Sequence, residues 1–267
     1  MQRTATNEQT RSSGPDVQVV TYHPAPAVVE RYVQLLPRLG AEPALAHWAA
    51  EYAAGHAGRC LWDARFLAER HRTGRLLNIG GAPYVFEMVL RKEAPELDIH
   101  TIDLDPCRFP GVAETLGIRT IAADIEHPDW QLDEKFDCIV CAEVMEHMRI
   151  DLLGTMRRIR EHLAPHGILY LTTPNGLSFW NVFMHLLRGR TGPPPSREWE
   201  KLATLGHMGH VREYSITEIK EILQSCGITI DQMLLRNAKE ARWFLRDLML
   251  RLRSEFAGEV VVIGRAT

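Results

Sequence analysis

The sequence lacks any long hydrophobic run, since no uninterrupted apolar stretch approaches the ~20 residues that a membrane-spanning helix needs. Cysteine is scarce: five residues in 267 form an odd, sparse set that argues against a disulfide framework and favours a reducing cytoplasm. No charge sign dominates, because 31 basic and 34 acidic residues give a formal net charge of −3. That balance disfavours a nucleic-acid or membrane surface. The polar start, MQRTATNEQTRSSGPD, lacks an apolar signal core, so we expect residues 1–20 to be a disordered tail.

Two patterns follow one another along the rest of the chain. Residues 21–74 carry apolar side chains at helical spacing and are predicted to form a helical N-terminal cap. From residue 75 onwards, short apolar runs alternate with helical stretches, which predicts a mainly parallel sheet with helices on both faces. Residues 176–210 interrupt this rhythm as an insertion after the fifth strand, of the kind that forms a substrate wall.

The predicted elements can be stated as segments. The seven expected strands are RLLNIGG, DIHTIDLD, RTIAADI, FDCIVCAE, GILYLTTPN, ITIDQMLL and EVVVIGRA. The expected helices between them are VFEMVLRKEA, LLGTMRRIREHLAPH and SITEIKEILQSCG, the last with a Ser215–Glu218 capping box. Cys138 and Cys141 spell C-x-x-C inside one strand, where their side chains should diverge, so we expect core residues rather than a redox or metal pair.

The first predicted strand–loop–helix turn, LLNIGGAPYVF, is where an open parallel sheet binds ligands. Gly80 and Gly81 would let the backbone approach a ligand, and the small Ala82 keeps that approach open. The loop is not G-x-G-x-x-G, which disfavours an oxidoreductase. Asp103 and Asp124 end the next two strands, placed to accept hydrogen bonds from a ribose diol and an adenine amino group. Taken singly, each acid is more typical of a turn or cap residue. The glycine loop, Asp103 and Asp124 in succession, each at the carboxyl end of a strand, are a more specific sign of a nucleoside-binding site.

The stretch CAEVMEHM concentrates polar groups directly after an apolar run. If the chain coils there, Glu143, Glu146 and His147 share one face at i, i+3 and i+4. Clustered acids are costly unless a positive charge neutralises them, and a divalent cation (magnesium, manganese, iron or zinc) suits two carboxylates with an imidazole. GHMGHVREYS offers His207 and His210 as a fourth ligand.

The order of these motifs resembles the class I S-adenosylmethionine-dependent methyltransferases. LLNIGGAP, IDLDP, AADIEHPDW and FDCIVCAEVMEHM match successive motifs of that family, from about Arg75 to the C-terminus. The resemblance implies a Rossmann-like domain over 75–267 with S-adenosylmethionine as cofactor. Asn78 replaces the usual leading acid, and Ala82 and Tyr84 stand where glycines are common. The implied cofactor-binding residues are Asn78, Gly80, Gly81, Ala82, Asp103, Leu104, Asp124, Ile125 and Ala142.

The E-x-x-E-H cluster with a distant histidine is similar to two methyltransferase groups: the ubiquinone-biosynthesis O-methyltransferases and the small-RNA 3′-terminal 2′-O-methyltransferases. In both, that histidine begins a segment like HVREYSITEI, which aligns His210 rather than His207. The resemblance implies a divalent metal held by Glu143, Glu146, His147 and His210. The metal would grip two neighbouring substrate oxygens and lower the pKa of the one to be methylated.

We therefore expect methyl transfer from S-adenosylmethionine to a hydroxyl of a small-molecule acceptor, with His147 and Glu143 as catalytic residues. Three alternatives stay open: metal-free O- or N-methylation with His147 as general base, RNA 2′-O-methylation, and a non-catalytic cofactor-binding scaffold or regulator. A purely structural His147 also stays open. RNA is disfavoured by the slightly acidic charge. We expect a cytoplasmic protein without a transmembrane segment, and homo-oligomerisation is left open.

Aromatic and basic side chains outside the motifs are candidates for a substrate wall, although such residues are more often packing. They are Trp180, Phe183, Arg188, Arg190 and Trp199 in the insertion, and Tyr22, Trp48 and Tyr52 near the N-terminus. The segment KEARWFLRDLMLRLRSE is amphipathic and basic, which suits a packing helix first, then an oligomer surface, then a membrane-surface contact.

Overall fold

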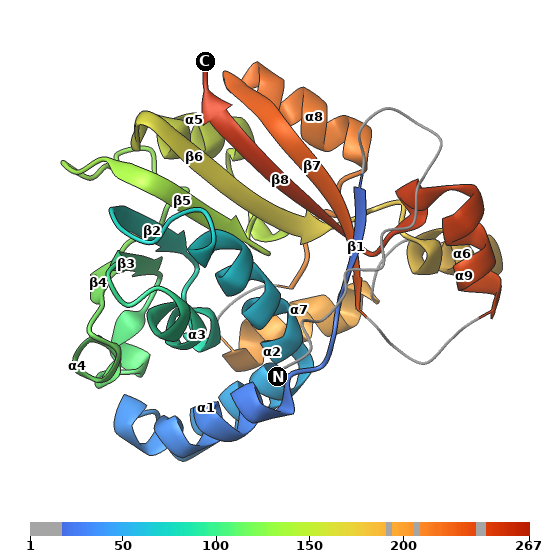
Figure 1. Ribbon diagram of the computed structural model, residues 1–267. Helices are drawn as coiled ribbons and strands as arrows, with labels where there is room; N and C mark the ends of the chain where they lie inside the picture. The colour runs from blue at the N-terminus through green and yellow to red at the C-terminus, as the bar shows by residue number, and fades with distance from the viewer. Residues whose placement is uncertain (1–17, 191–193, 206–208, 239–243) are drawn as a thin grey trace, which may run out of the picture.

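The computed structural model describes residues 18–190, 194–205, 209–238 and 244–267. Within them, eight strands form one sheet in the order β1-β7-β8-β6-β5-β2-β3-β4 (Figure 1). The strands are β1 (Gln18–Tyr22), β2 (Arg75–Ile79), β3 (Asp98–Asp103), β4 (Arg119–Ala122), β5 (Phe136–Ala142), β6 (Leu163–Pro174), β7 (Ile228–Ala238) and β8 (Glu259–Ala266). The helices are α1 (Pro26–Leu39), α2 (Pro43–Ala68), α3 (Val85–Glu93), α4 (Val112–Leu116), α5 (Leu152–Glu161), α6 (Phe179–Arg188), α7 (Pro195–Leu205), α8 (Ile216–Ser225) and α9 (Phe244–Leu252). Three short 3-10 turns complete the list: η1 (Pro106–Arg108), η2 (Met145–His147) and η3 (Ser254–Phe256).

The mainly parallel α/β sheet predicted from the sequence is confirmed. All seven predicted strands are present as β2 to β8, and β8 alone runs antiparallel to its neighbours β6 and β7. The central strands β2 and β5 are nearly continuous apolar runs because helices cover both of their faces. Their carboxyl ends, where the motifs lie, meet at one edge of the sheet.

Two sequence expectations need correction. Residues 18–20, assigned to a disordered tail, belong to β1, whose β-branched QVVTY pairs in parallel with β7, Gln18 opposite Leu234. The predicted helix over 152–166 ends at Glu161, and β6 already begins at Leu163. His166 has a left-handed φ of 66° at an irregularity of the β5–β6 pairing, and Pro165 cannot donate the hydrogen bond that would continue a helix.

Helices cover the two faces of the sheet as separate layers. Side chains of α1, α2, α3 and α4 pack with one face into a buried apolar cluster, and those of α5 and α8 pack with the other. Each fully buried leucine or isoleucine in these clusters stabilises the fold by about 1.5–3 kcal/mol. Cys138 lies in the first cluster and Cys141 in the second, so the two thiols do diverge, as predicted.

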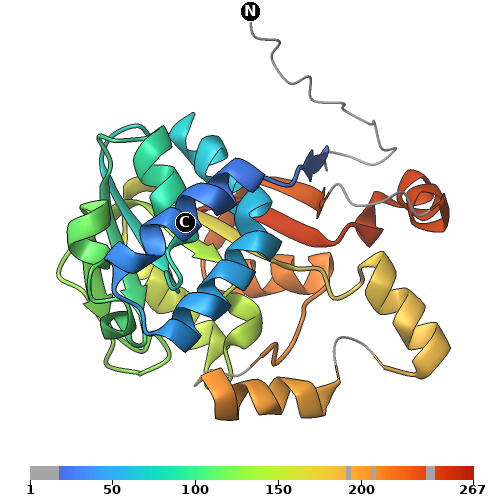
Figure 2. The same ribbon diagram turned by 90° about the horizontal axis from the view of Figure 1, so that it is seen from below.

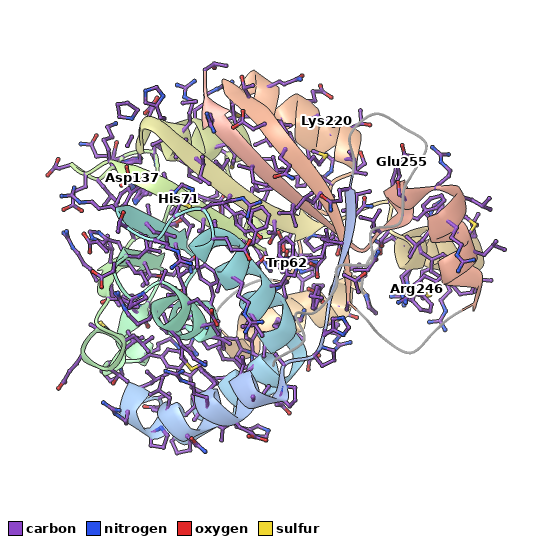
Figure 3. The ribbon with its side chains drawn as sticks, in the orientation of Figure 1. Trp62, His71, Asp137, Lys220, Arg246 and Glu255 are labelled. Atoms are coloured by element: carbon purple, nitrogen blue, oxygen red, sulfur yellow. The ribbon has the colours of Figure 1, made fainter. Side chains whose placement is uncertain are left out.

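The cap packs on one face of the sheet, whereas the insertion follows the carboxyl end of β6. Figure 2 shows α1 and α2 crossing the near side of the sheet, while α6 and α7 stand away from it. α9 contacts α6, and Figure 3 labels Arg246 on α9 and Trp62 where α2 meets the sheet. Among the described helices, none is long and apolar enough to cross a bilayer. The sheet edge is thus flanked by segments from both ends of the sequence.

Candidate active site

The loop after β2 has the tight backbone that its glycines predicted. Gly80 has φ of 73°, and the amides of Gly80 and Gly81 both donate to the carbonyl of Ile102 on β3, at 2.8 and 3.2 Å. A Cβ atom at Gly81 would lie 2.1 Å from the Thr101 hydroxyl, so no larger residue fits. Tyr84, where related sequences commonly have glycine, takes the glycine-like φ of 68°. The loop therefore keeps its shape despite the missing glycine.

Asn78 directs its amide away from the open edge and into the fold. Its Nδ2 donates to Glu87 Oε1 at 2.7 Å, and Thr101 Oγ1 donates to the same oxygen at 2.9 Å. Glu87, on α3, is fully buried, and burial raises the pKa of its carboxyl to about 7. A carboxyl group thus lies beneath the loop although the strand carries an amide. Sequence reasoning missed Glu87, since an acid inside an amphipathic helix resembles a solvent-exposed residue.

The acids predicted to bind a nucleoside lie at neighbouring strand ends. Asp103 closes β3, and its Oδ2 accepts from the Ala82 amide at 3.0 Å, which brings this acid against the glycine loop. Asp124 follows β4, is exposed, and accepts from the Glu126 amide at 2.9 Å. The remaining predicted cofactor residues are the exposed Leu104, the buried Ile125 and the half-buried Ala142 at the end of β5. All of them lie along the carboxyl edge of β3, β4 and β5.

Three of the four predicted metal ligands come together. Glu146 and His147 lie in η2, and His210 comes from the segment before α8; one ligand atom of each lies within 4.8 Å of the others. The Nε2 atoms of His147 and His210 point at the same carboxylate oxygen, Oε1 of Glu146, from 4.0 and 3.9 Å. The Glu146 carbonyl accepts from the amides of Val211 and Arg212 at 2.8 and 3.2 Å, which ties the His210 segment to the turn. His207 lies outside the described residues.

Only one of the two carboxylate oxygens of Glu146 has a hydrogen-bond partner among the described residues. The side chain is 0% exposed; Oε2 accepts from Thr173 Oγ1 at 3.1 Å, while Oε1 has no hydrogen-bond partner among the described residues. Burial, and then the charge of Glu143, raises the pKa of Glu146 to about 8. An orphaned buried oxygen faced by two imidazole nitrogens is a donor set of one carboxylate and two histidines, which suits iron, zinc or manganese. The residues present therefore fit a divalent cation.

His210 is held by a chain of hydrogen bonds that sequence reasoning did not identify. Glu213 Oε1 lies 2.7 Å from His210 Nδ1, and Asn181 of α6 donates to Glu213 Oε2 at 2.6 Å. Glu198 of α7 accepts from the His210 amide at 3.0 Å. Burial alone would lower the pKa of His210, but the hydrogen bond to Glu213 and the nearby charge of Glu146 outweigh it and raise the pKa. The contact fixes a proton on Nδ1 and leaves Nε2 directed at Glu146.

Glu143 is the one predicted ligand that the structure does not bring into this group. It follows the end of β5 with φ of 57°, and its carboxylate pairs with Arg59 of α2, Nη1 to Oε2, at 2.6 Å. Thr172 Oγ1 donates to Glu143 Oε1 at 2.8 Å, and Arg59 Nη2 donates to the Tyr52 hydroxyl at 3.3 Å. Sequence reasoning missed Arg59, because one of two arginines in an alanine-rich helix carries no signal of a buried partner.

A cavity of about 670 Å³ opens onto the Glu146–His147–His210 cluster. Of the predicted wall residues, those that line it are Tyr22, Trp48, Tyr52 and Trp180. Phe183, Arg188, Arg190 and Trp199 are not among its lining residues; Phe183 stacks on Phe179, and the Trp199 side chain is exposed. The cap and the insertion thus supply aromatic walls to one cavity, with the polar cluster on its inner side.

A second buried charge network lies beside this cavity and joins the cap to the sheet. Arg236 of β7 pairs with Asp63 of α2, and its Nε donates to Glu259 Oε2 on β8 at 2.7 Å. Asp63 also accepts from the Tyr170 hydroxyl, and Glu259 accepts from Tyr22 at 3.2 Å. Arg236 is 0% exposed, and the two carboxylates hold the pKa of its guanidinium well above its ordinary value against the effect of burial.

Comparisons with known proteins identify the family and the fold. A family model described as a methyltransferase domain matches residues 49–233. No curated protein matches the sequence. Among solved structures, the chain is similar to a TehB-like S-adenosylmethionine-dependent methyltransferase from Corynebacterium glutamicum, with 17% identity, a TM-score of 0.50 and coverage of 91% of this chain and 100% of that one.

A second similar structure is an O-methyltransferase from neocarzinostatin biosynthesis, with 13% identity and a TM-score of 0.52. The match covers 84% of this chain and 57% of that one, so the chain spans little more than half of that protein's length. At these identities, both likenesses concern the fold.

Proposed function

We propose, since this chain belongs to the methyltransferase-domain family, that it transfers a methyl group from S-adenosylmethionine to a hydroxyl of a small-molecule acceptor. We further propose that Glu146, His147 and His210 hold a divalent cation that assists the transfer. One observation carries the second proposal: the orphaned buried Oε1 of Glu146, faced by two imidazole nitrogens, lies at the wall of a cavity large enough for an acceptor.

The cofactor would lie along the carboxyl edge of the sheet, as in the family that the motifs resemble. Gly80 and Gly81 would pass beneath it, Asp103 would bind its ribose, and Asp124 with Ile125 would hold its adenine. Asp103 already meets the glycine loop through the Ala82 amide, which supports its place next to a bound nucleoside. Leu104, Ala142 and Asn78 complete the proposed contacts, Asn78 through the loop that it braces from below.

The chemistry of the acceptor follows from the cavity wall. A divalent cation, when bound, supplies positive charge that lowers the pKa of an acceptor hydroxyl. Trp48 and Tyr52 from the cap and Trp180 from the insertion would hold a flat acceptor and exclude water from it. The acceptor hydroxyl would lose its proton to solvent as it binds; its oxygen would then form the new O–CH3 bond as the sulfonium C–S bond breaks, which leaves S-adenosylhomocysteine. The chain's own part is positioning and electrostatics.

An aromatic acceptor with neighbouring oxygens suits this arrangement best. The neocarzinostatin O-methyltransferase structure contains S-adenosyl-L-homocysteine and 1,4-dihydroxy-2-naphthoic acid. That acceptor belongs to the chemical class that an aromatic-walled cavity of about 670 Å³ can hold. Neighbouring oxygens are proposed because a cation with few protein ligands has positions left for both. Oxygen rather than nitrogen as the methylated atom follows from the same argument.

A metal titration tests the proposal. Tag-free protein stripped with chelator and saturated with S-adenosylhomocysteine would be titrated with magnesium, manganese, iron(II) and zinc by calorimetry. We expect one-to-one binding of at least one of these ions, lost in His210→Ala and retained in His185→Ala, whose exposed histidine lies on α6. Methyl transfer to catechol-type acceptors should follow the same pattern across the variants.

If no metal ion binds, or if metal ions bind equally well to His210→Ala, the proposed metal site is refuted. His147 would then be tested as the general base: its substitution should abolish transfer in chelator-treated protein, and the acceptor search would widen to single hydroxyls and amines. Cofactor binding without transfer to any hydroxylated or amine acceptor would support a scaffold or regulator instead.

A further inference from the structure

The motif that suggested the metal site contains two glutamates, but only one of them lies in the cluster of possible ligand atoms. An E-x-x-E-H pattern with a distant histidine implies four ligands, yet the atoms that meet come from Glu146, His147 and His210 only. Glu143 lies between β5, which ends at Ala142, and η2, which begins at Met145, so it is not part of a helical turn, and its φ of 57° is not helical either. The helical spacing of i, i+3 and i+4 therefore does not apply to it.

Arg59 and Thr172 give each oxygen of the Glu143 carboxylate a partner that does not belong to the Glu146–His147–His210 group. The Arg59–Glu143 ion pair spans 2.6 Å, and the two side chains are only 8% and 14% exposed. The other Glu143 oxygen accepts from Thr172 Oγ1 at 2.8 Å. Charge-assisted hydrogen bonds are strong, and removing one member of a buried pair leaves an uncompensated charge, so this carboxylate does not exchange readily for a cation.

Helix α2, which carries the Arg59 partner of Glu143, also contributes side chains to the wall of the cavity. Arg59 lies on α2 with Trp48, Tyr52 and His56, all of which line the cavity, and its Nη2 donates to the Tyr52 hydroxyl at 3.3 Å. The position of Arg59 is therefore fixed both by the carboxylate and by the cap. Glu143 lines the same cavity and its charge acts on His210, but its carboxylate contributes no atom to the Glu146–His147–His210 group.

We propose that this protein holds its cation with three ligands, Glu146, His147 and His210, and that Arg59 keeps Glu143 out of coordination. The inference rests on the proposed function and deepens it. With one carboxylate fewer, the cation keeps more of its positive charge and has more positions open to the acceptor. The acceptor class that fits is a molecule with two adjacent oxygens, such as a catechol, which can occupy two positions at once.

Metal affinity measured on matched variants tests the ligand count. In S-adenosylhomocysteine-saturated protein at pH 8, Glu146→Gln should lower the affinity for manganese or zinc at least 100-fold. Glu143→Gln, the same chemical change three residues earlier, should leave it within about threefold of wild type, because it removes no ligand. Circular dichroism would confirm that both variants are folded.

The Arg59→Met variant tests the proposal independently, because it breaks the ion pair of Glu143 and keeps the Glu143 carboxylate. We expect tighter metal binding, by about tenfold, as the released carboxylate joins the shell, together with weaker calorimetric binding of catechol to the metal-loaded protein. A Glu143→Gln loss as large as that of Glu146→Gln, or metal binding weakened in Arg59→Met, would overturn the three-ligand site while leaving the metal itself in place. Wild-type protein that binds none of the ions would refute the proposed function, and this inference with it.

Discussion

Glu87 is a single carboxyl whose surroundings fix its protonation. It is fully buried, accepts from Asn78 and Thr101 through one oxygen, and has no partner at the other among the described residues. Burial raises its pKa from the ordinary 4.5 to about 7. Between these two values the folded protein holds a proton that the unfolded chain has released, so stability falls as the pH rises through that window.

Glu87→Gln should flatten this pH dependence. Glutamine keeps an acceptor for Asn78 and Thr101 but carries no charge to bury, so the variant should exceed wild type by about 1–3 kcal/mol in unfolding free energy at pH 8. The two proteins should converge near pH 5. Urea denaturation at both pH values measures the difference, with Glu114→Gln on α4, an exposed acid, as the control. Equal slopes for Glu87→Gln and wild type would show that Glu87 is ionised throughout.

Glu213 has no contact with the cavity, yet it orients a residue that does. Glu213→Ala should weaken metal binding about 10–100-fold, because His210 loses the partner that fixes its ring and tautomer. Glu213→Gln, which can still accept from Nδ1, should recover part of that affinity. Calorimetry in the presence of S-adenosylhomocysteine gives the values, and Glu221→Gln on the exposed side of α8 is the matched control. An affinity unchanged in Glu213→Ala would assign Glu213 to folding alone.

At the scale of single elements, the start of α8 is stabilised by the capping box that the sequence predicted. Ser215 Oγ accepts from the Glu218 amide, and the Ser215 amide donates to Glu218 Oε2 at 2.8 Å, the reciprocal pair of a capping box. Ser215→Ala should lower the unfolding free energy by about 1 kcal/mol. Ser225→Ala, at the other end of the same helix, should change it by a few tenths, since only one exposed hydrogen bond is lost. Urea denaturation of the two variants side by side decides whether the cap matters.

Elements buried on both faces were the ones that the sequence predicted well. β2 and β5 stand out because a doubly covered strand is a continuous apolar run bounded by turn residues. β1 was missed because five residues next to a polar stretch carry no sign of a partner strand that lies more than 200 positions away. α5 was extended too far because the segment HLAPH after Glu161 continues the apolar spacing of the helix, although β6 begins within it.

The candidate site divides in the same way between local and distant information. His210 was singled out by resemblance to a segment that begins with histidine, and the structure places it beside Glu146 and His147. Glu143 was grouped with them by a helical spacing rule, although it directly follows β5 and precedes η2. Arg59 could not be predicted from the sequence, because its partner Glu143 lies 84 positions away. A buried ion pair leaves no periodic pattern in either segment.

At the scale of the whole molecule, Arg236 joins the cap, β7 and β8 through two buried carboxylates. Arg236→Met should lower the unfolding free energy by about 3–5 kcal/mol, because Asp63 and Glu259 are left as buried, uncompensated charges. Arg265→Met removes an exposed pair with Asp231 and should cost less than about 1 kcal/mol. Thermal and urea denaturation of both variants would test this, and equal losses would mean that the Arg236 network adds no more than a surface pair.

The strand β1 has a consequence for any shortened form of this protein. It pairs with the outer side of β7 over residues 234–238, so this part of β7 has a neighbouring strand on each side. The methyltransferase family model begins only at residue 49, and a version trimmed to that boundary would lose β1 together with α1 and the start of α2, leaving the outer amides and carbonyls of residues 234–238 open. An open, apolar sheet edge recruits strands from other molecules. Trimming to the family boundary should therefore yield a protein that self-associates with rising concentration, visible by light scattering, while the full chain under the same conditions does not.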